Sequence, residues 1–354
     1  MSKDYWNERD IKSREKTIEL LSYLPPFVSK FINYIMDNSS ALTRENYVRD
    51  ITLFLDYVCE EKGIEDKRDI TVDTLAGLDI DFLSSYSIHL ANYVKEGKIH
   101  KESEVTRSRR LSALRSLYKY LYISGQIPEN QMSKIRSPKT DDKEIIRLEK
   151  DEAQDFLSAV TEGTGTEKSN QAKKYNEIQS LRDQTILSLM LSTGIRVSEC
   201  VGLNINDVDL KRFSIRVIRK GHSEYTTLYY SDEMSDLMLD YLMYREKLEA
   251  LEGSEDALFL SSRKTRMGVR AMEKMVKKYA ERAGIAKHIT PHKLRSSYGT
   301  ALYEATGDIR AVADSLGHKS IETTSRKYVQ SNKERRKALR GAVNLIRKGE
   351  ETEE

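Results

Sequence analysis

The sequence predicts a mainly α-helical protein of two domains, the first all α and the second mostly helical with a small antiparallel sheet. The chain has 354 residues, which is long for a single core, so two domains are expected. Apolar residues recur at helical spacing along most of it. One stretch, 213–230, instead alternates apolar and polar residues around a turn with a glycine, which is typical of a β-hairpin.

The first half contains the clearest helical patterns. In one of them the apolar side chains from Tyr47 to Val58 fall on one face, and Thr43 is a plausible N-cap. In another, leucines form a stripe with arginines largely off it, and Gly125 ends the helix. The sequence therefore predicts an all-α domain of four or five helices, including those at residues 26–36, 43–59, 80–94 and 103–122.

The second half is expected to alternate helices with one hairpin. Helices are predicted at residues 150–160 and 178–192, separated by a polar loop at 161–174. The hairpin turns at Lys220-Gly221-His222, and helices then continue to an amphipathic helix at about 332–348.

A boundary between the domains is indicated by composition. Residues 128–147 contain two prolines, many charges and no sustained periodicity, as an extended linker does. The expected organisation is an N-terminal extension, a helical domain, this linker and a C-terminal domain, at residues 1–23, 24–127, 128–147 and 148–354.

Composition limits the function classes. No apolar run is long enough to span a bilayer, and the N-terminus lacks the pattern of a signal peptide. The two cysteines, Cys59 and Cys200, lie within apolar helical patterns and are expected to be reduced core residues. We therefore expect a cytoplasmic protein with no membrane contact. The net charge is only +3, so any argument for a nucleic-acid partner must rest on local clusters of basic residues.

The segment TPHKLRSSYGT carries a candidate anion site. Thr290 is a suitable N-cap and Pro291 suits the first helical position, so a helix should begin here with His292 and Arg295 on one face. The N–H groups at a helix N-terminus, together with a guanidinium, suit a phosphate. A capped helix with surface charges is the alternative.

Two further segments resemble parts of an active site only when taken together. In STGIRVSEC, Arg196 follows a helix end at Gly194, and Glu199 lies one turn onward. In LGHKSIETTSRKY, a turn at Gly317 is followed by His318, and Tyr328 lies ten residues later. An exposed arginine–glutamate pair is common and contributes little by itself.

In this order and spacing, TGIRVSE, HKLR, LGH and the final tyrosine resemble the signature of tyrosine site-specific recombinases. The helical first half resembles the core-binding (SAM-like) domain of the Xer recombinases, with TRENYVRDITLFLDY and TRSRRLSALRSLYKYL in the expected places. Length, the PPFVSKFINY segment and the loop near residues 161–174 further resemble those Xer recombinases that act as a single protein.

The resemblance implies a set of catalytic roles. Tyr328 would attack a DNA phosphodiester and form a 3′-phosphotyrosine, with a Holliday junction as intermediate. The remaining catalytic groups would be Arg196, Lys220, His292, Arg295 and His318. The sequence departs from the family pattern at Ser296, which replaces an accessory histidine and is expected to be tolerated without a catalytic role. At the hairpin turn, either Lys220 or Arg219 could reach the DNA, and Lys220 is favoured. No P-loop or spaced metal ligands occur in the sequence, so no cofactor or metal is expected.

The implied partner is double-stranded DNA carrying a specific recombination site. Family behaviour implies a homo-tetramer on two sites, with the helix at about 332–348 docking on the neighbouring subunit, and a nucleoid-associated location. An FtsK-type DNA translocase is left open as a further partner, because the sequence does not decide whether one activates the protein. The expected result is resolution of chromosome dimers. The residues expected to contact DNA are Thr43, Arg44, Arg107, Arg109, Arg110, Arg115, Arg266, Arg270 and Lys274.

Three alternatives stay open. A phage or mobile-element integrase would share the chemistry but usually has an arm-binding domain, for which the roughly twenty residues expected before the first helix leave little room. A catalytically silent DNA-binding protein of the same fold would form no covalent adduct with DNA. A type IB topoisomerase would relax supercoils as a monomer on arbitrary sequences.

Overall fold

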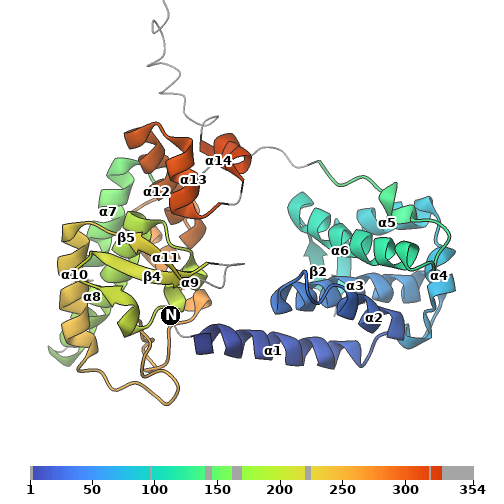
Figure 1. The fold of residues 1–354 in the computed structure, drawn as a ribbon, viewed down its shortest axis with the longest axis horizontal. Coiled ribbons are helices and arrows are strands. Elements are labelled where there is room, and N and C mark those ends of the chain that lie inside the picture. Colours follow the sequence, from blue (N-terminus) through green and yellow to red (C-terminus); the bar gives the residue numbers. More distant parts are fainter. Residues whose placement is uncertain are drawn as a thin grey trace, which may run out of the picture. The chain divides into compact units, whose positions relative to one another are not determined.

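The computed structural model describes residues 3–95, 98–139, 146–161, 170–219, 225–318 and 320–328. The chain divides into two compact units, Lys3–Asp142 and a second formed mainly by Lys143–Glu354 (Figure 1). The first is helical apart from one short hairpin, and the second is helical with a three-stranded antiparallel sheet. The predicted fold class is therefore confirmed.

The first unit is built around one apolar core. Its largest fully buried side chains include Phe31, Phe54, Tyr86 and Tyr118, and Phe54 meets Tyr86 edge to face with ring centroids 5.0 Å apart. Antiparallel strands β1 (Asn92–Lys95) and β2 (Lys98–Lys101) form the hairpin. The helices are α1 (Lys3–Leu21), α2 (Pro26–Tyr34), α3 (Ala41–Lys62), α4 (Val72–Ala76), α5 (Ile80–His89) and α6 (Glu104–Ile123), with short 3-10 turns at Lys67–Asp69 and Gln131–Ser133.

Capping side chains set where the two long helices begin. The Ser40 hydroxyl accepts a hydrogen bond from the Thr43 N–H at the start of α3, and Ser103 accepts one from Thr106 at the start of α6. The predicted cap Thr43 is wrong by three residues, because α3 begins one turn earlier and Ser40 caps the N–H of Thr43 itself. Gly125 (φ +69°) lies just beyond α6 in the left-handed region, as predicted.

Two elements of this unit differ from the sequence prediction. Helix α1 occupies the expected extension and packs against α3. Its buried residues include Ser13 and Thr17, and the Thr17 hydroxyl donates to the Ser13 carbonyl (2.7 Å). Because these buried residues are polar, the spacing of apolar residues did not predict this helix. The helix predicted to continue to residue 94 ends at His89, and the hairpin follows.

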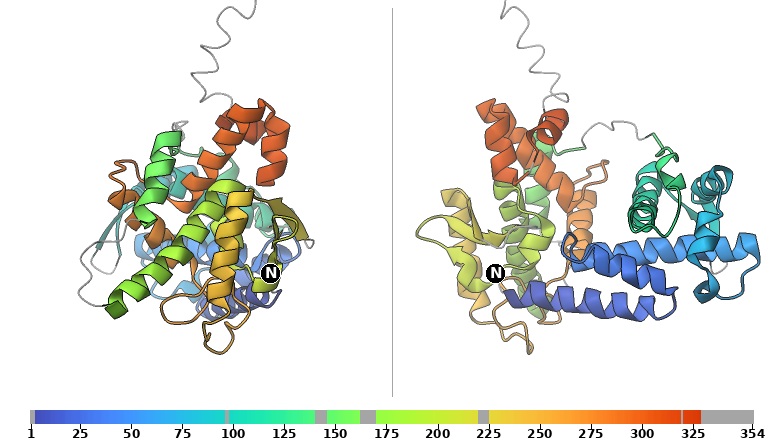
Figure 2. Two further views of the ribbon diagram at one scale, coloured as in Figure 1. Left: turned by 90° about the vertical axis from the view of Figure 1, so that its left-hand side faces the viewer. Right: turned by 45° about the vertical axis from the view of Figure 1, so that its right-hand side comes forward.

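The second unit packs its helices around α8. This helix contacts α7, α10 and α12, and Figure 2 shows α8 and α10 side by side. In the sheet, β4 is central, and Ile215 of β4 is paired with Leu228 of β5. The elements are α7 (Lys150–Thr161), α8 (Asn170–Thr193), α9 (Val197–Val201), β3 (Val208–Asp209), β4 (Ser214–Ile218), β5 (Tyr225–Tyr229), α10 (Asp232–Arg245), α11 (Val269–Arg282), α12 (Pro291–Thr306), α13 (Ile309–Leu316) and α14 (Ile321–Tyr328), with a 3-10 turn at Ile205–Asp207.

The predicted hairpin corresponds to β4 and β5, although its turn with Lys220 lies outside the described residues. The predicted loop at 161–174 is too long at its carboxyl end, because α8 already begins at Asn170. The amphipathic helix expected at about 332–348 also lies outside the described residues. Within the part of the chain that is described, no helix is long and apolar enough to cross a membrane.

Truncating the core of the first unit tests this packing. Phe54 is fully buried, so Phe54→Ala is expected to lower the free energy of unfolding of this unit by roughly 3–5 kcal/mol. Urea denaturation followed by circular dichroism would measure it. Ile88→Ala is the control, because Ile88 is 73% exposed and should change stability by less than about 0.5 kcal/mol. Equal losses in the two variants would contradict the described core.

Candidate active site

Helix α12 carries the first part of the candidate site. Thr290 occupies the N-cap position, although its side chain makes no capping hydrogen bond, and Pro291 occupies the first turn, as the sequence predicted. His292 is exposed, whereas Arg295, one turn along, is only 6% exposed. Arg295 donates to the carbonyl oxygens of Gly194, just after α8, and Leu316, at the end of α13. One guanidinium therefore links the ends of two other helices.

Arg196 reaches the same place from the start of α9. Its Nη1 donates to Oε1 of Glu199 (2.7 Å) and its Nη2 donates to the carbonyl oxygen of Gly317 (3.1 Å). Glu199 is buried and also accepts a hydrogen bond from the Arg196 backbone N–H (3.0 Å). Glu199 therefore fixes the side chain of Arg196.

A third arginine binds the preceding carbonyls of α13. Arg219, directly after β4, donates to the carbonyl oxygens of Asp314 (3.0 Å) and Ser315. The carbonyls of four consecutive residues, 314 to 317, thus each accept a hydrogen bond from an arginine. The last carbonyls of a helix have no partner in the helix and bear partial negative charge, which explains why guanidinium groups gather there. Figure 1 shows α12, α13 and α14 grouped in this unit.

Tyr328 lies at the end of α14 and is 2% exposed. It packs with Tyr303, Val312 and Leu316 in a small apolar cluster. Its hydroxyl lies so close to Gly299 of α12 that a Cβ at position 299 would come within 2.7 Å of it. Only a residue without a side chain leaves room for this placement of the hydroxyl.

The surroundings of Tyr328 act on its acidity in both directions. Burial raises the pKa of Tyr328 above its ordinary value, whereas the positive charge of Arg295 and a hydrogen bond with Ser296 oppose the rise. Ser296 is itself 4% exposed, and its single hydroxyl proton can instead be donated to the His292 carbonyl (3.1 Å). The absence of a catalytic role for Ser296 stays a prediction, but the sequence did not indicate that its side chain contacts the candidate nucleophile.

His318 completes the cluster immediately after the α13 end. Its Nδ1 lies 2.9 Å from the hydroxyl oxygen of Thr324, a fully buried residue of α14. This contact orients the imidazole relative to the helix that carries Tyr328. The turn at Gly317 (φ +59°), which places His318, uses the left-handed region that favours glycine.

Charge within the cluster is unbalanced. Burial lowers the pKa of Arg295 to about 10, and the positive charges of Arg196 and Arg219 act in the same direction, while Glu199 opposes them. The guanidinium of Arg295 therefore remains protonated at neutral pH. Each of these cations makes the charged form of its neighbours less favourable. A bound anion would offset this repulsion, so the cluster is a favourable environment for an anion.

The structure thus brings together four of the six predicted catalytic residues, Arg196, Arg295, His318 and Tyr328, through shared contacts at the α13 end. His292 lies one turn before Arg295 on α12. Lys220 lies outside the described residues. The sequence reasoning did not assign roles to Ser296 and Gly299, although both follow His292 at helical spacing.

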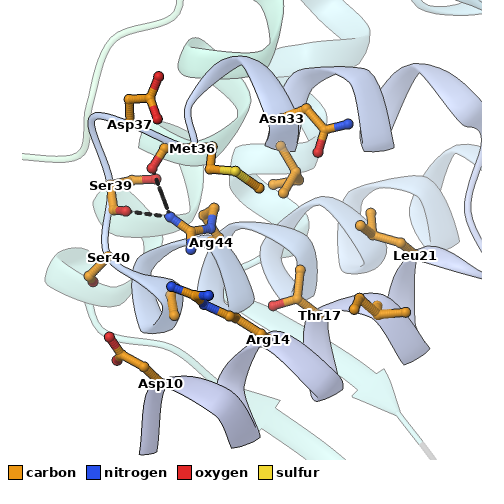
Figure 3. Close-up of a pocket in the computed structure, with 13 residues that line it drawn as sticks. Asp10, Arg14, Thr17, Leu21, Asn33, Met36, Asp37, Ser39, Ser40 and Arg44 are labelled. Atoms are coloured by element: carbon orange, nitrogen blue, oxygen red, sulfur yellow. Dashed lines mark hydrogen bonds between the residues drawn. The ribbon is translucent and has the colours of Figure 1, made fainter. Parts of the chain in front are cut away.

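Several arginines predicted to contact DNA bind the protein itself. Arg44 is 7% exposed and donates to the carbonyl oxygens of Met36 (3.0 Å) and Ser39, beside a pocket of about 500 Å³ that Arg14 also lines (Figure 3). Arg115 donates to the carbonyl of Ile135 (3.0 Å). Arg266 donates to the carbonyls of Val201 and Leu203, at 3.1 and 2.8 Å.

The other predicted DNA contacts differ in exposure. Arg109 and Arg110 share the buried carboxylate of Asp50, whose pKa is raised by burial although both arginines oppose the rise. Arg109 is still 49% exposed. Thr43 bonds to Ser40, and Arg107 pairs with Glu104 (3.6 Å). Two residues on α11, Arg270 and Lys274, are exposed.

The first unit is helical, and the second is helical with a small sheet. In the second unit, arginines, a histidine and a tyrosine meet at one helix end, as in the tyrosine recombinases. The family model described as "Phage integrase family" matches residues 147–335, and that of the phage integrase N-terminal SAM-like domain matches residues 28–125. This chain belongs to the phage integrase family and is an enzyme of the tyrosine recombinase class.

Relatives match nearly the whole chain. Tyrosine recombinase XerS of Streptococcus thermophilus (strain CNRZ 1066) is 32% identical over 350 residues, which cover 92% of this chain and 97% of that protein. Tyrosine recombinase XerC of Caldanaerobacter subterraneus subsp. tengcongensis is 30% identical over 331 residues, with 89% and 86% covered.

Solved structures share the fold. XerH recombinase bound to its difH substrate matches with a TM-score of 0.60 at 22% identity, covering 86% of this chain and 80% of that one. The Tn1549 transposon integrase in complex with circular intermediate DNA matches with a TM-score of 0.64 at 16% identity, covering 89% and 98%.

Replacing Ser296 tests the environment of Tyr328. In Ser296→Ala the hydrogen bond that lowers the pKa of Tyr328 is lost, so that pKa should rise further. Because the phenolate fraction at a given pH then falls, a given rate of covalent DNA cleavage should require a higher pH. Single-turnover cleavage measured from neutral to alkaline pH would detect the displacement.

The control for this experiment is Ser297→Ala. Its hydroxyl lies next in sequence but accepts a hydrogen bond from the Leu148 N–H (2.8 Å). This variant should leave the pH dependence of cleavage unchanged. Identical pH profiles for Ser296→Ala and wild type would contradict a role for Ser296 in tuning Tyr328.

Proposed function

We propose that this protein is a site-specific DNA recombinase that cleaves and rejoins DNA through a 3′-phosphotyrosine at Tyr328. The observation that carries the proposal is the meeting of two guanidinium groups, Arg196 and Arg295, with the tyrosine at the carboxyl end of α13. No cofactor enters the proposed reaction, because the covalent link retains the energy of the phosphodiester bond.

The arginines would stabilise the transition state. A phosphodiester under attack gains negative charge on its non-bridging oxygens, and a planar guanidinium offers paired N–H donors to them. Arg196 and Arg295 supply such groups already held in place by Glu199 and by backbone carbonyls. His318 would donate a further hydrogen bond. Preorganised donors of this kind act strongly, because no reorganisation is needed during the reaction.

Proton transfer would involve the remaining groups. A phenol is mostly protonated at neutral pH, and burial raises the pKa of Tyr328 still further, so its proton must be removed as it attacks. His292 is the proposed acceptor, and Lys220 is the proposed donor to the 5′-hydroxyl leaving group. The Tyr328 hydroxyl must also leave its contact with Gly299 to reach a phosphate.

The biological task is proposed from the relatives. XerS and XerC match nearly the full chain, which supports resolution of chromosome dimers by strand exchange through a Holliday junction. We propose a homo-tetramer on two DNA sites, coupled by the segment at about 332–348, in the nucleoid of the cytoplasm and activated by an FtsK-type translocase. The fold shared with the Tn1549 integrase keeps excision or integration of a mobile element as the second candidate.

Covalent trapping tests the chemistry and finds the target sequence in one experiment. A library of nicked duplexes with a randomised stretch is incubated with the protein, and adducts that survive denaturation are sequenced. Wild type should give adducts enriched in one sequence, and Tyr328→Phe should give none, because it lacks the attacking oxygen. Binding to one sequence without any adduct would instead indicate a catalytically silent DNA-binding protein.

The recovered sequence also separates the candidate tasks. A site found once in the chromosome supports dimer resolution, whereas sites at the ends of a mobile element support integration. Adducts on arbitrary sequence, with relaxation of supercoils by a monomer, would contradict site-specific recombination and indicate a topoisomerase.

Arg270→Gln tests the DNA-binding surface. Because Arg270 is exposed on α11 and is proposed to contact a phosphate, its loss should weaken binding about equally for all sequences and lower the salt slope by about 1. Fluorescence anisotropy at several salt concentrations would measure both. Arg212→Gln, at a side chain 81% exposed between β3 and β4, is the control that should leave the slope unchanged.

A further inference from the structure

We propose that Arg219 is a positioning residue for DNA cleavage: it fixes the carboxyl end of α13 so that this end presents Arg196 and Arg295 to the scissile phosphate. This inference rests on the proposed function. It assigns to Arg219 a role distinct from direct contact with DNA, since its guanidinium is directed into the protein.

The contacts of Arg219 place it behind the two candidate phosphate-binding arginines. Its Nη1 and Nη2 bind the carbonyl oxygens of Asp314 and Ser315. The next two carbonyls, of Leu316 and Gly317, bind Arg295 and Arg196. Because these carbonyls follow one another along a single turn, moving the first pair also moves the second. Arg219 therefore controls the acceptors on which the other two guanidinium groups depend.

Gly317 shows how closely the turn fits around Arg219. A Cβ at position 317 would lie only 1.8 Å from Nη1 of Arg219, and Gly317 also has φ +59°. Position 317 therefore has two separate reasons to be glycine, namely the left-handed backbone and the space occupied by a guanidinium. The second reason exists only because Arg219 is there.

Stability alone does not explain a charged group at this position. Arg219 is 6% exposed, burial lowers its pKa, and Arg196 adds repulsion. The carboxylates that oppose these effects are the buried Glu199 and the exposed Asp314. Replacing buried ionic groups by apolar ones is often neutral or stabilising. A third cation beside Arg196 and Arg295 is instead suited to a site that receives an anion.

The experiment compares Arg219→Gln with wild type on two nicked suicide duplexes that carry the trapped site. One has a normal scissile phosphate, and the other has a methylphosphonate, in which a methyl group replaces a charged non-bridging oxygen. Arg219→Gln should slow single-turnover cleavage of the phosphate about tenfold or more while site affinity stays within about twofold. On the methylphosphonate the difference should largely disappear, because there is less charge for Arg196 and Arg295 to neutralise.

Arg216→Gln is the matched control. Arg216 lies on β4 three residues before Arg219 and also donates to a backbone carbonyl, that of Asn206 (2.8 Å), at an exposed position. It should cleave both duplexes at the wild-type rate. Arg219→Lys keeps the charge but loses the paired donors, and should be slower than wild type on the phosphate substrate. It also keeps the test valid should the glutamine variant fail to fold.

The outcomes separate the possible roles. Wild-type rates for Arg219→Gln and Arg219→Lys on the phosphate would overturn the proposal, and so would the same loss on both duplexes, which a purely structural role predicts. Rates are normalised to the final amount of adduct, so a reduced active fraction does not imitate slow cleavage. Absence of any adduct with wild type would instead reject the proposed recombinase activity itself.

Discussion

The carbonyl groups at the carboxyl end of α13 hold the candidate active site together. Four of them in succession accept hydrogen bonds from Arg196, Arg219 and Arg295, which come from three separate elements. The arginines thereby supply donors to carbonyls of the last turn, which lack an i+4 partner within the helix. The same turn places His318, and the leucine before it packs against Tyr328. Loss of this helix end would disperse the whole site.

Local sequence signals were sufficient to predict much of this arrangement. Pro291 suits the first turn of a helix for a backbone reason that needs no distant partner, so His292 and Arg295 could be placed on that helix. Glycines with positive φ at positions 194 and 317 likewise mark turns. The contacts of Arg219 and Ser296 were not predictable in this way, because their partners on α13 and α14 lie distant in the sequence.

The same limitation applies to the arginines expected on the DNA. Sequence pattern shows that an arginine lies off an apolar stripe, but its partner can lie far along the chain. Arg109 binds Asp50, which is separated from it by nearly half of the first unit, and Arg266 binds the backbone near Val201. Helix α1 was missed for a related reason, since Ser13 and Thr17 bury a face that hydropathy does not mark. In each case the contacts of the side chain or helix depend on residues distant in the sequence.

The space beside Gly299 has a consequence for where Tyr328 can lie. The absence of one side chain on α12 creates the recess that receives the phenol oxygen of Tyr328. The space that holds this oxygen therefore depends on a residue outside the predicted catalytic set. A single added methyl group would come within 2.7 Å of that oxygen, so the position of Tyr328 on α14 depends on the absence of a side chain on a different helix.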